Sequence, residues 1–217
     1  LGTEAGGAAA PGAWRARLRN LWQGWPRQAD CAVAAERQAA LRLTPQVGAD
    51  GQLRAVLAST AAFAPFGQLV APVEDGDEFC AGDAQLDGLA NGTPRFYLMT
   101  LRGPRPLQFA RITHHRMVTQ CLGSVGGDEV FYLAVHAPTP EGVPATLGGV
   151  RAFLIPPRTF VKLHRGTWHA GPLWGDAPER FFYNLELHDT NVSDHHSITL
   201  KHPARPDGLI QIVPPSD

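Results

Sequence analysis

Histidine side chains gather in two short segments of this chain, and histidine is the side chain best suited to chemistry near neutral pH. One segment contains His114 and His115, with Gln120 shortly after them, and the other contains His164 and His169. An imidazole binds divalent transition metals, and it also accepts or donates a proton. Two such segments predict one shared site, in which the histidines act either as metal ligands or as proton-transfer groups.

Strand geometry decides which of these side chains can point the same way. Lys162 and His164 have the same parity, so both can project from one face of a strand into a barrel interior. His115 and Gln120 have opposite parity, so a bend or bulge must separate them if they share a site. Arg95 follows a turn at residues 91–94, where its guanidinium could hold a carboxylate through two hydrogen bonds.

The segments that must position these residues have the pattern of strands. The chain has 23 glycines and 19 prolines, which separate short apolar runs. Residues 52–63 are the helical candidate inside the domain. Strands in this number and spacing predict an all-β domain, a sandwich or a barrel. They are expected at residues 66–70, 95–101, 107–113, 130–136, 150–155, 160–164, 180–187, 197–200 and 209–213.

Charge and composition limit the partners of the chain. Its 217 residues include 19 basic and 20 acidic ones, and the net charge of -1 favours neither nucleic acid nor an anionic membrane. No apolar run reaches the ~18 residues of a membrane-spanning helix. We therefore expect a small-molecule substrate or a second copy of the chain as the partner. Three widely separated cysteines predict a reducing compartment, cytoplasmic or organellar rather than secreted.

Residues 1–40 differ in composition from the rest of the chain. They are rich in alanine and arginine, and no acidic residue lies between Ala5 and Ala29. This composition is typical of an organelle transit segment and equally of a disordered leader. Tryptophan and leucine at near-helical spacing also permit a short amphipathic helix. We therefore divide the chain into a disordered or helical leader, residues 1–40, and one domain, residues 41–217.

The histidine segments resemble the two metal-binding motifs of cupin barrels. His115 followed by Gln120 is similar to the later part of the first motif, and Gly166 followed by His169 is similar to the second. Thr113 stands where the first motif usually has its first histidine. The resemblance implies a cupin-type β-barrel or jelly roll with a short helix. It also implies a divalent metal, Mn, Ni, Zn or Fe, bound by His115, Gln120 and His169.

A more specific resemblance is to the ureidoglycolate lyase family, in the form found in plants and algae. It is carried by residues 163–173, Leu-His-Arg-Gly-Thr-Trp-His-Ala-Gly-Pro-Leu, and by residues 151–153, Arg-Ala-Phe. Residues 63–70, Phe-Ala-Pro-Phe-Gly-Gln-Leu-Val, are similar to the opening of the family pattern. His115 with Thr119 and Gln120 is similar to the family's His-Pro-x-x-Thr-Gln. The resemblance covers residues 41–190, approximately the predicted domain.

The resemblance implies an enzyme of allantoin and purine breakdown. Such an enzyme eliminates urea from ureidoglycolate and leaves glyoxylate. His164 and His169 are then the expected catalytic acid and base, in either order. Alternatively, His169 joins His115 and Gln120 around the metal, which would polarise the substrate hydroxyl.

Substrate binding and assembly follow from the same resemblance. The expected substrate-binding residues are Arg95, Lys162 and His114, with Arg95 holding the carboxylate. Family members form dimers of barrels, which implies a homodimer. Two alternative functions are compatible with the same pocket. One is a metal-dependent enzyme that acts on a different small acid, and the other is a non-catalytic protein that binds a small carboxylate.

Overall fold

The chain folds almost entirely into β-strands, which confirms the predicted all-β class. The computed structural model describes residues 47–215, so the predicted leader, residues 1–40, lies outside the described residues. Two short helices, α3 (Thr60–Phe63) and α4 (Thr190–Ser193), accompany the strands of the described part. No helix within it is long and apolar enough to cross a lipid bilayer. The strands are β1 (Gln52–Leu57), β2 (Gly67–Val70), β3 (Pro94–Arg102), β4 (Gln108–Phe109), β5 (Arg111–His114), β6 (Gln120–Ser124), β7 (Phe131–His136), β8 (Arg151–Ile155), β9 (Phe160–Leu163), β10 (Trp168–Leu173), β11 (Glu179–Leu187), β12 (His196–Thr199) and β13 (Ile210–Val213).

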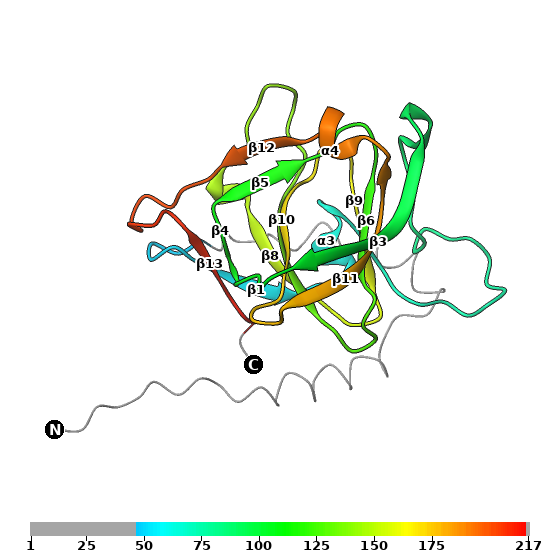
Figure 1. Ribbon diagram of the computed structural model, residues 1–217, viewed down its shortest axis with the longest axis horizontal. Helices are drawn as coiled ribbons and strands as arrows, with labels where there is room; N and C mark the ends of the chain where they lie inside the picture. The colour runs from blue at the N-terminus through cyan, green and yellow to red at the C-terminus, as the bar shows by residue number, and fades with distance from the viewer. Residues whose placement is uncertain (1–46, 216–217) are drawn as a thin grey trace.

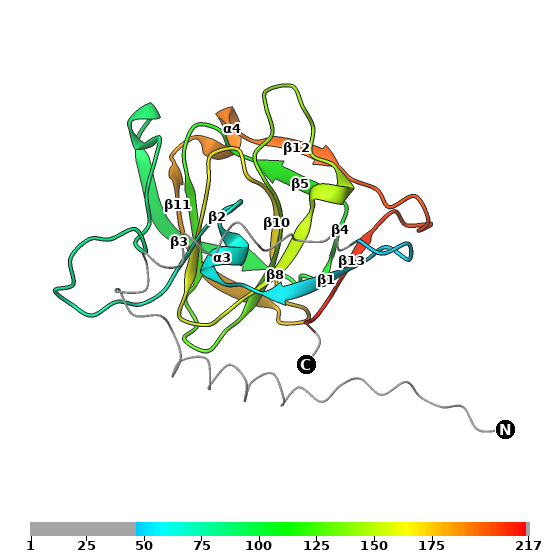
Figure 2. The ribbon, with the colours of Figure 1, turned by 180° about the vertical axis from the view of Figure 1, so that it is seen from behind.

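The strands form two curled sheets. The larger has eight strands in the order β12-β5-β10-β7-β8-β1-β13-β4, and the smaller has five in the order β2-β9-β6-β11-β3. Figures 1 and 2 show both sheets curving around a common interior, with α4 at one rim beside β12. This half-barrel of mainly antiparallel strands is consistent with a cupin-like fold.

Alternation along the central strands places apolar side chains on both faces of the larger sheet. In β7, Leu133 and Val135 pack between the sheets in one cluster with Phe182 of β11. Ala134 lies on the opposite face, in a second cluster that includes Trp168 and comes from the larger sheet and its loops. One face of the larger sheet is therefore covered by the curl of that same sheet and its loops. The opposite face packs against the smaller sheet.

The helix predicted at residues 52–63 is wrong over its first half. Residues Gln52–Leu57 form strand β1, whose buried Leu53 and Ala55 alternate with exposed neighbours. Only Thr60–Phe63 is helical, and the hydroxyl of Ser59 caps it by accepting a hydrogen bond from the backbone N–H of Ala62. The local sequence pattern fits a helix or a strand, and parallel pairing of β1 with both β8 and β13 selects the strand.

The strand prediction also differs from the structure in three other regions of the chain. The single strand expected at residues 107–113 is divided at Ala110 into β4 and β5, which occupy different positions in the larger sheet. Strands β6 and β10 were not predicted, although both lie centrally in their sheets. Gly123 interrupts the apolar pattern of β6, and Gly171 and Pro172 interrupt that of β10.

Candidate functional site

A cavity of about 440 Å³ lies between the two sheets. Strands β3, β6 and β11 of the smaller sheet and β5 and β10 of the larger sheet contribute its walls. His115, His169 and Gln120 all line it, so three of the predicted site residues meet in one place. A cavity of this size can accommodate a small organic acid.

His115 and His169 approach the cavity from neighbouring strands. Thr113 of β5 pairs with His169 of β10, and His115 follows β5 directly, so the two imidazole centroids lie 5.4 Å apart. Nδ1 of His115 is 2.6 Å from the carbonyl oxygen of Asp194, and Nδ1 of His169 is 3.3 Å from that of Thr167. Because a carbonyl oxygen only accepts hydrogen bonds, each Nδ1 carries the proton and each Nε2 keeps its lone pair.

Burial keeps both of these imidazoles neutral. The side chains of His115 and His169 are almost completely removed from solvent. Loss of water, followed by the neighbouring His115 ring, lowers the pKa of His169 to about 3. Burial also lowers the pKa of His115. At neutral pH, both Nε2 atoms are therefore bases or metal ligands rather than acids.

The bend expected between His115 and Gln120 is present, and Asp194 holds it. Strand β5 ends just before His115, and β6 begins at Gln120. The buried carboxylate of Asp194 accepts hydrogen bonds from the backbone N–H groups of Arg116 at 2.8 Å and Met117 at 2.7 Å. Since the carbonyl of Asp194 also accepts the His115 hydrogen bond, this one residue orients both the bend and the imidazole.

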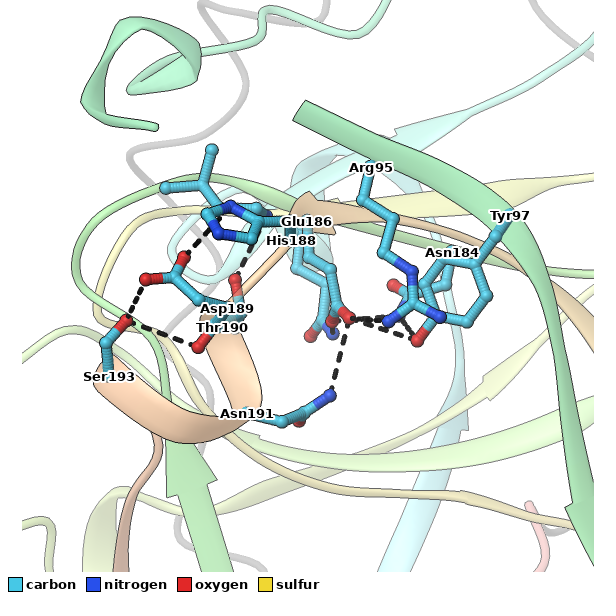
Figure 3. A network of polar contacts seen from close by, with 11 residues as sticks. Arg95, Tyr97, Asn184, Glu186, His188, Asp189, Thr190, Asn191 and Ser193 are labelled. Carbon is cyan, nitrogen blue, oxygen red and sulfur yellow. Dashed lines mark hydrogen bonds and ion pairs between the residues drawn. The ribbon is translucent and has the colours of Figure 1, made fainter. Parts of the chain in front are cut away.

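Glu186 of β11 is a buried carboxylate, only 1% exposed, in the wall of the cavity. Its oxygens accept hydrogen bonds at 3.0 Å from the hydroxyl of Tyr97 and from Nδ2 of Asn184. Two longer contacts of 3.4 Å come from Nε2 of Gln120 and Nδ2 of Asn191. Figure 3 shows Tyr97, Asn184 and Asn191 converging on this carboxylate. We call these five residues the Glu186 network.

Two arginine side chains, Arg105 and Arg111, also line the cavity. Arg111, Thr113 and His115 line it together because they alternate along β5 and its continuation. The exposed Arg111 guanidinium has no hydrogen bond or ion pair with any described residue. Arg105 is more constrained, because it donates a hydrogen bond to the carbonyl of Pro172 and lies 5.6 Å from the Trp174 ring centroid. Arg111 is therefore the cation best placed to bind an anionic ligand.

Lys162 and His164 meet each other but do not line the cavity. Nζ of Lys162 donates to Nδ1 of His164 at 3.2 Å, and Nε2 of His164 donates to the carbonyl of Ala64 at 3.1 Å. Val161 and Leu163, which alternate with them, pack between the sheets. Lys162 and His164 therefore extend from the opposite face of the smaller sheet, and the predicted pair of His164 with His169 is not assembled around the cavity.

Arg95 and His114 also lie outside the cavity lining. The Arg95 guanidinium is 3.6 Å from the Tyr97 ring centroid and 3.8 Å from the Glu186 carboxylate. Its positive charge therefore already makes a cation–π contact and an ion pair within the protein. His114 stacks on Trp168 with a centroid distance of 3.8 Å. Burial, followed by the charge of Arg116, lowers the pKa of His114 to about 4.

Several cavity residues were not predicted from the sequence. One of them is His195, whose ring centroid lies 5.5 Å from that of His115. Asn184 and Glu186 share one face of the strand predicted at residues 180–187, and an acid at an inward position of such a strand is the signal that could have identified them. Likewise, the shared parity of Arg111 and His115 was visible in the sequence.

The predicted metal ligands do not form a complete coordination set. No group of three or more His, Cys, Asp or Glu side chains among residues 47–215 has the arrangement needed to hold a metal ion. Of the predicted ligands, His115 and His169 offer imidazole nitrogens, but Gln120 offers only a neutral amide oxygen. This donor set does not fit a tightly bound Mn, Ni, Zn or Fe ion, for which three or more strong protein ligands are usual.

The fold and the site together define an all-β half-barrel protein with a cavity between its sheets and two buried imidazoles, His115 and His169, in the cavity wall. The family described as Ureidoglycolate lyase matches residues 50–199, a range that includes every residue lining the cavity. The chain therefore belongs to the ureidoglycolate lyase family, as its motifs predicted. No curated protein matches the chain.

Proposed function

We propose that this protein eliminates urea from ureidoglycolate and releases glyoxylate. The observation that carries the proposal is a pair of neutral imidazoles, His115 and His169, in a cavity that is also lined by Arg111, an arginine with no ion pair within residues 47–215. Membership of the family supports this choice of substrate. The cavity volume of about 440 Å³ is ample for a two-carbon acid with one ureido substituent.

The elimination moves one proton within the substrate. Nε2 of one imidazole takes the proton of the substrate hydroxyl, and the electrons of that O–H bond form the carbonyl of glyoxylate. The C–N bond breaks, and its electron pair goes to the nitrogen of urea. Because His115 and His169 are both neutral at rest, the proton that reaches the departing nitrogen is the one taken from the hydroxyl. The electron pairs and protons balance without a further reactant.

The same burial that makes these imidazoles neutral also helps the second proton transfer. A protonated ring with a lowered pKa is a stronger acid than an ordinary imidazolium, so it gives its proton more readily to the leaving nitrogen. We therefore propose that His115 and His169 act together as a proton shuttle. In this mechanism, His115 takes the role first expected of His164.

The substrate carboxylate requires a cation that is not already paired. We propose Arg111 for this contact in place of Arg95, because Arg95 lies against Tyr97 and Glu186. Arg111 of β5 and His115, which follows β5 directly, both line the cavity, which supports placing the carboxylate and the reacting carbon in it together.

Self-association through the outer face of β3 and β11 is part of the proposal. Phe96, Leu98, Phe181 and Tyr183 are 44–69% exposed large hydrophobic residues on one face of this strand pair, with Phe96 and Tyr183 stacked at 6.0 Å. An exposed apolar patch of this kind is typical of a protein interface. We propose that it forms the homodimer contact, which sedimentation of the wild type and a Leu98→Glu variant would test.

The function is tested by incubating the purified protein with ureidoglycolate and measuring glyoxylate with a coupled dehydrogenase. Release of equal amounts of glyoxylate and urea supports the lyase. Binding of small carboxylates without turnover would instead support the non-catalytic alternative. Turnover of another small acid, only after addition of Mn, Ni, Zn or Fe, would support the metal-dependent alternative.

A further inference from the structure

Two buried oxygen atoms beside the cavity have no hydrogen-bond donor among the described residues. They are Oε1 of Gln120 and Oδ1 of Asn184. Both side chains line the cavity, and the two residues are 8% and 1% exposed, respectively. Buried side-chain oxygens usually have a hydrogen-bond donor, so two of them at one cavity indicate a ligand that supplies N–H or O–H groups.

Glu186 fixes the direction in which both amides face. Its Oε2 accepts from Nδ2 of Asn184 at 3.0 Å and from Nε2 of Gln120 at 3.4 Å. Tyr97 and Asn191 donate to its other oxygen. A carboxylate only accepts hydrogen bonds, so turning either amide over would place oxygen against oxygen. Glu186 is therefore a positioning residue that keeps both carbonyl oxygens available as acceptors. Figure 3 shows its contact with Asn184.

We propose that the carbonyl oxygens of Gln120 and Asn184 form a subsite for the carbamoyl group of the substrate. This inference rests on the proposed lyase function and adds the direction in which the substrate binds. The N–H groups of a carbamoyl group match two acceptors, whereas a carboxylate has no donor and is repelled by them and by Glu186. Arg111 attracts the carboxylate instead, so the substrate lies with its two ends at different parts of the cavity.

Two unreactive probes isolate the contribution of the carbamoyl group. Hydantoate is ureidoglycolate without the hydroxyl, and N-acetylglycine has a methyl group in place of the terminal NH2 of hydantoate. The two probes share the carboxylate and have similar shapes, so their ratio of dissociation constants reports the N–H contacts. We expect calorimetry with the full chain to give hydantoate the tighter binding by about 10-fold or more, the effect of one well-placed hydrogen bond to a buried acceptor.

Variants of the two acceptors should remove this preference. Gln120→Met and Asn184→Leu keep approximately the side-chain size but remove the oxygen, so each should reduce the ratio by about 10-fold without weakening N-acetylglycine. Gln120→Met is the milder change, because its contact with Glu186 is the longer of the two. Retained binding of N-acetylglycine also shows that each variant is folded. Arg111→Met is the matched control, because it should weaken both probes equally and leave the ratio unchanged.

The binding measurements test the proposed subsite, and turnover of ureidoglycolate tests the proposed lyase function separately. A wild-type preference for hydantoate that disappears in Gln120→Met supports the subsite. Equal binding of the two probes, a preference that survives in both acceptor variants, or no binding of either probe overturns it. If ureidoglycolate is nevertheless converted to glyoxylate, the subsite alone fails. If there is also no turnover, the proposed function fails as well.

Discussion

Mild acid should destabilise the folded protein because two buried imidazoles resist protonation. Burial lowers the pKa of His169 to about 3 and that of His114 to about 4, whereas histidine in an unfolded chain titrates near pH ~6.5. Between these values, the unfolded state binds protons that the folded state does not. The stabilising contribution is therefore complete above about pH 6.5 and is lost as the pH falls toward the folded-state pKa values.

The size of the effect follows from the two pKa values. For one such histidine, lowering the pH from about 7.5 to about 5.5 costs about 1.4 kcal/mol, because only the unfolded chain is protonated in that interval. Both folded-state pKa values lie below this range. His169 and His114 together should therefore reduce the free energy of unfolding by up to about 3 kcal/mol over those two pH units.

Guanidinium chloride unfolding at several pH values measures this quantity directly. The matched variant is His114→Phe, because it keeps an aromatic ring on Trp168 and removes a nitrogen that has no hydrogen-bond partner among the described residues. Its free energy of unfolding should fall about 1.4 kcal/mol less than that of the wild type over the same interval. A wild-type stability that does not change between about pH 7.5 and about pH 5.5, or an equal loss in the variant, would show that these imidazoles do not resist protonation in the folded state.

Four further outcomes are expected. His169→Ala should lower kcat at least ~100-fold through loss of a proton-transfer group, while circular dichroism stays that of the wild type; an unchanged kcat would exclude this role. Arg111→Met should raise KM much more than it lowers kcat, and an unaltered KM would argue against the carboxylate contact. Dialysis against a chelator should leave turnover intact, whereas loss that added Mn, Ni, Zn or Fe restores would show that a metal is required. Gly67→Ala should reduce the free energy of unfolding by about 1–3 kcal/mol, because the added Cβ would lie 2.0 Å from the backbone oxygen of Lys162; unchanged thermal unfolding would contradict that packing.

Strands with alternating apolar residues were predictable, and strands defined mainly by their partners were not. Val161 and Leu163 alternate with Lys162 and His164, and β9 forms where that pattern predicts it. Strand β10 contains Gly171 and Pro172, which have low strand propensity, and it forms because β7 and β5 pair with it from distant parts of the chain. A local sequence pattern does not predict such pairing between distant parts of the chain.

The candidate site was predictable only in part, for a geometric reason. Histidine spacing predicted that two segments share a cavity, and His115 and His169 do line one. Parity also predicted that Lys162 and His164 share a face, and they hydrogen-bond to each other. However, parity does not say which face of a sheet becomes the interior. That depends on how the sheets pack, which places His164 away from the cavity and Glu186 in its wall.

The most direct test of the account is the rate at which ureidoglycolate is converted to glyoxylate by the wild type, by His115→Ala and by His169→Ala. The wild type should turn over ureidoglycolate, and each variant should be at least ~100-fold slower, because each lacks one imidazole of the proposed shuttle. His164→Ala, which alters a histidine outside the cavity lining, is the informative comparison. Wild-type rates in both cavity variants, or a loss confined to His164→Ala, would contradict the central claim.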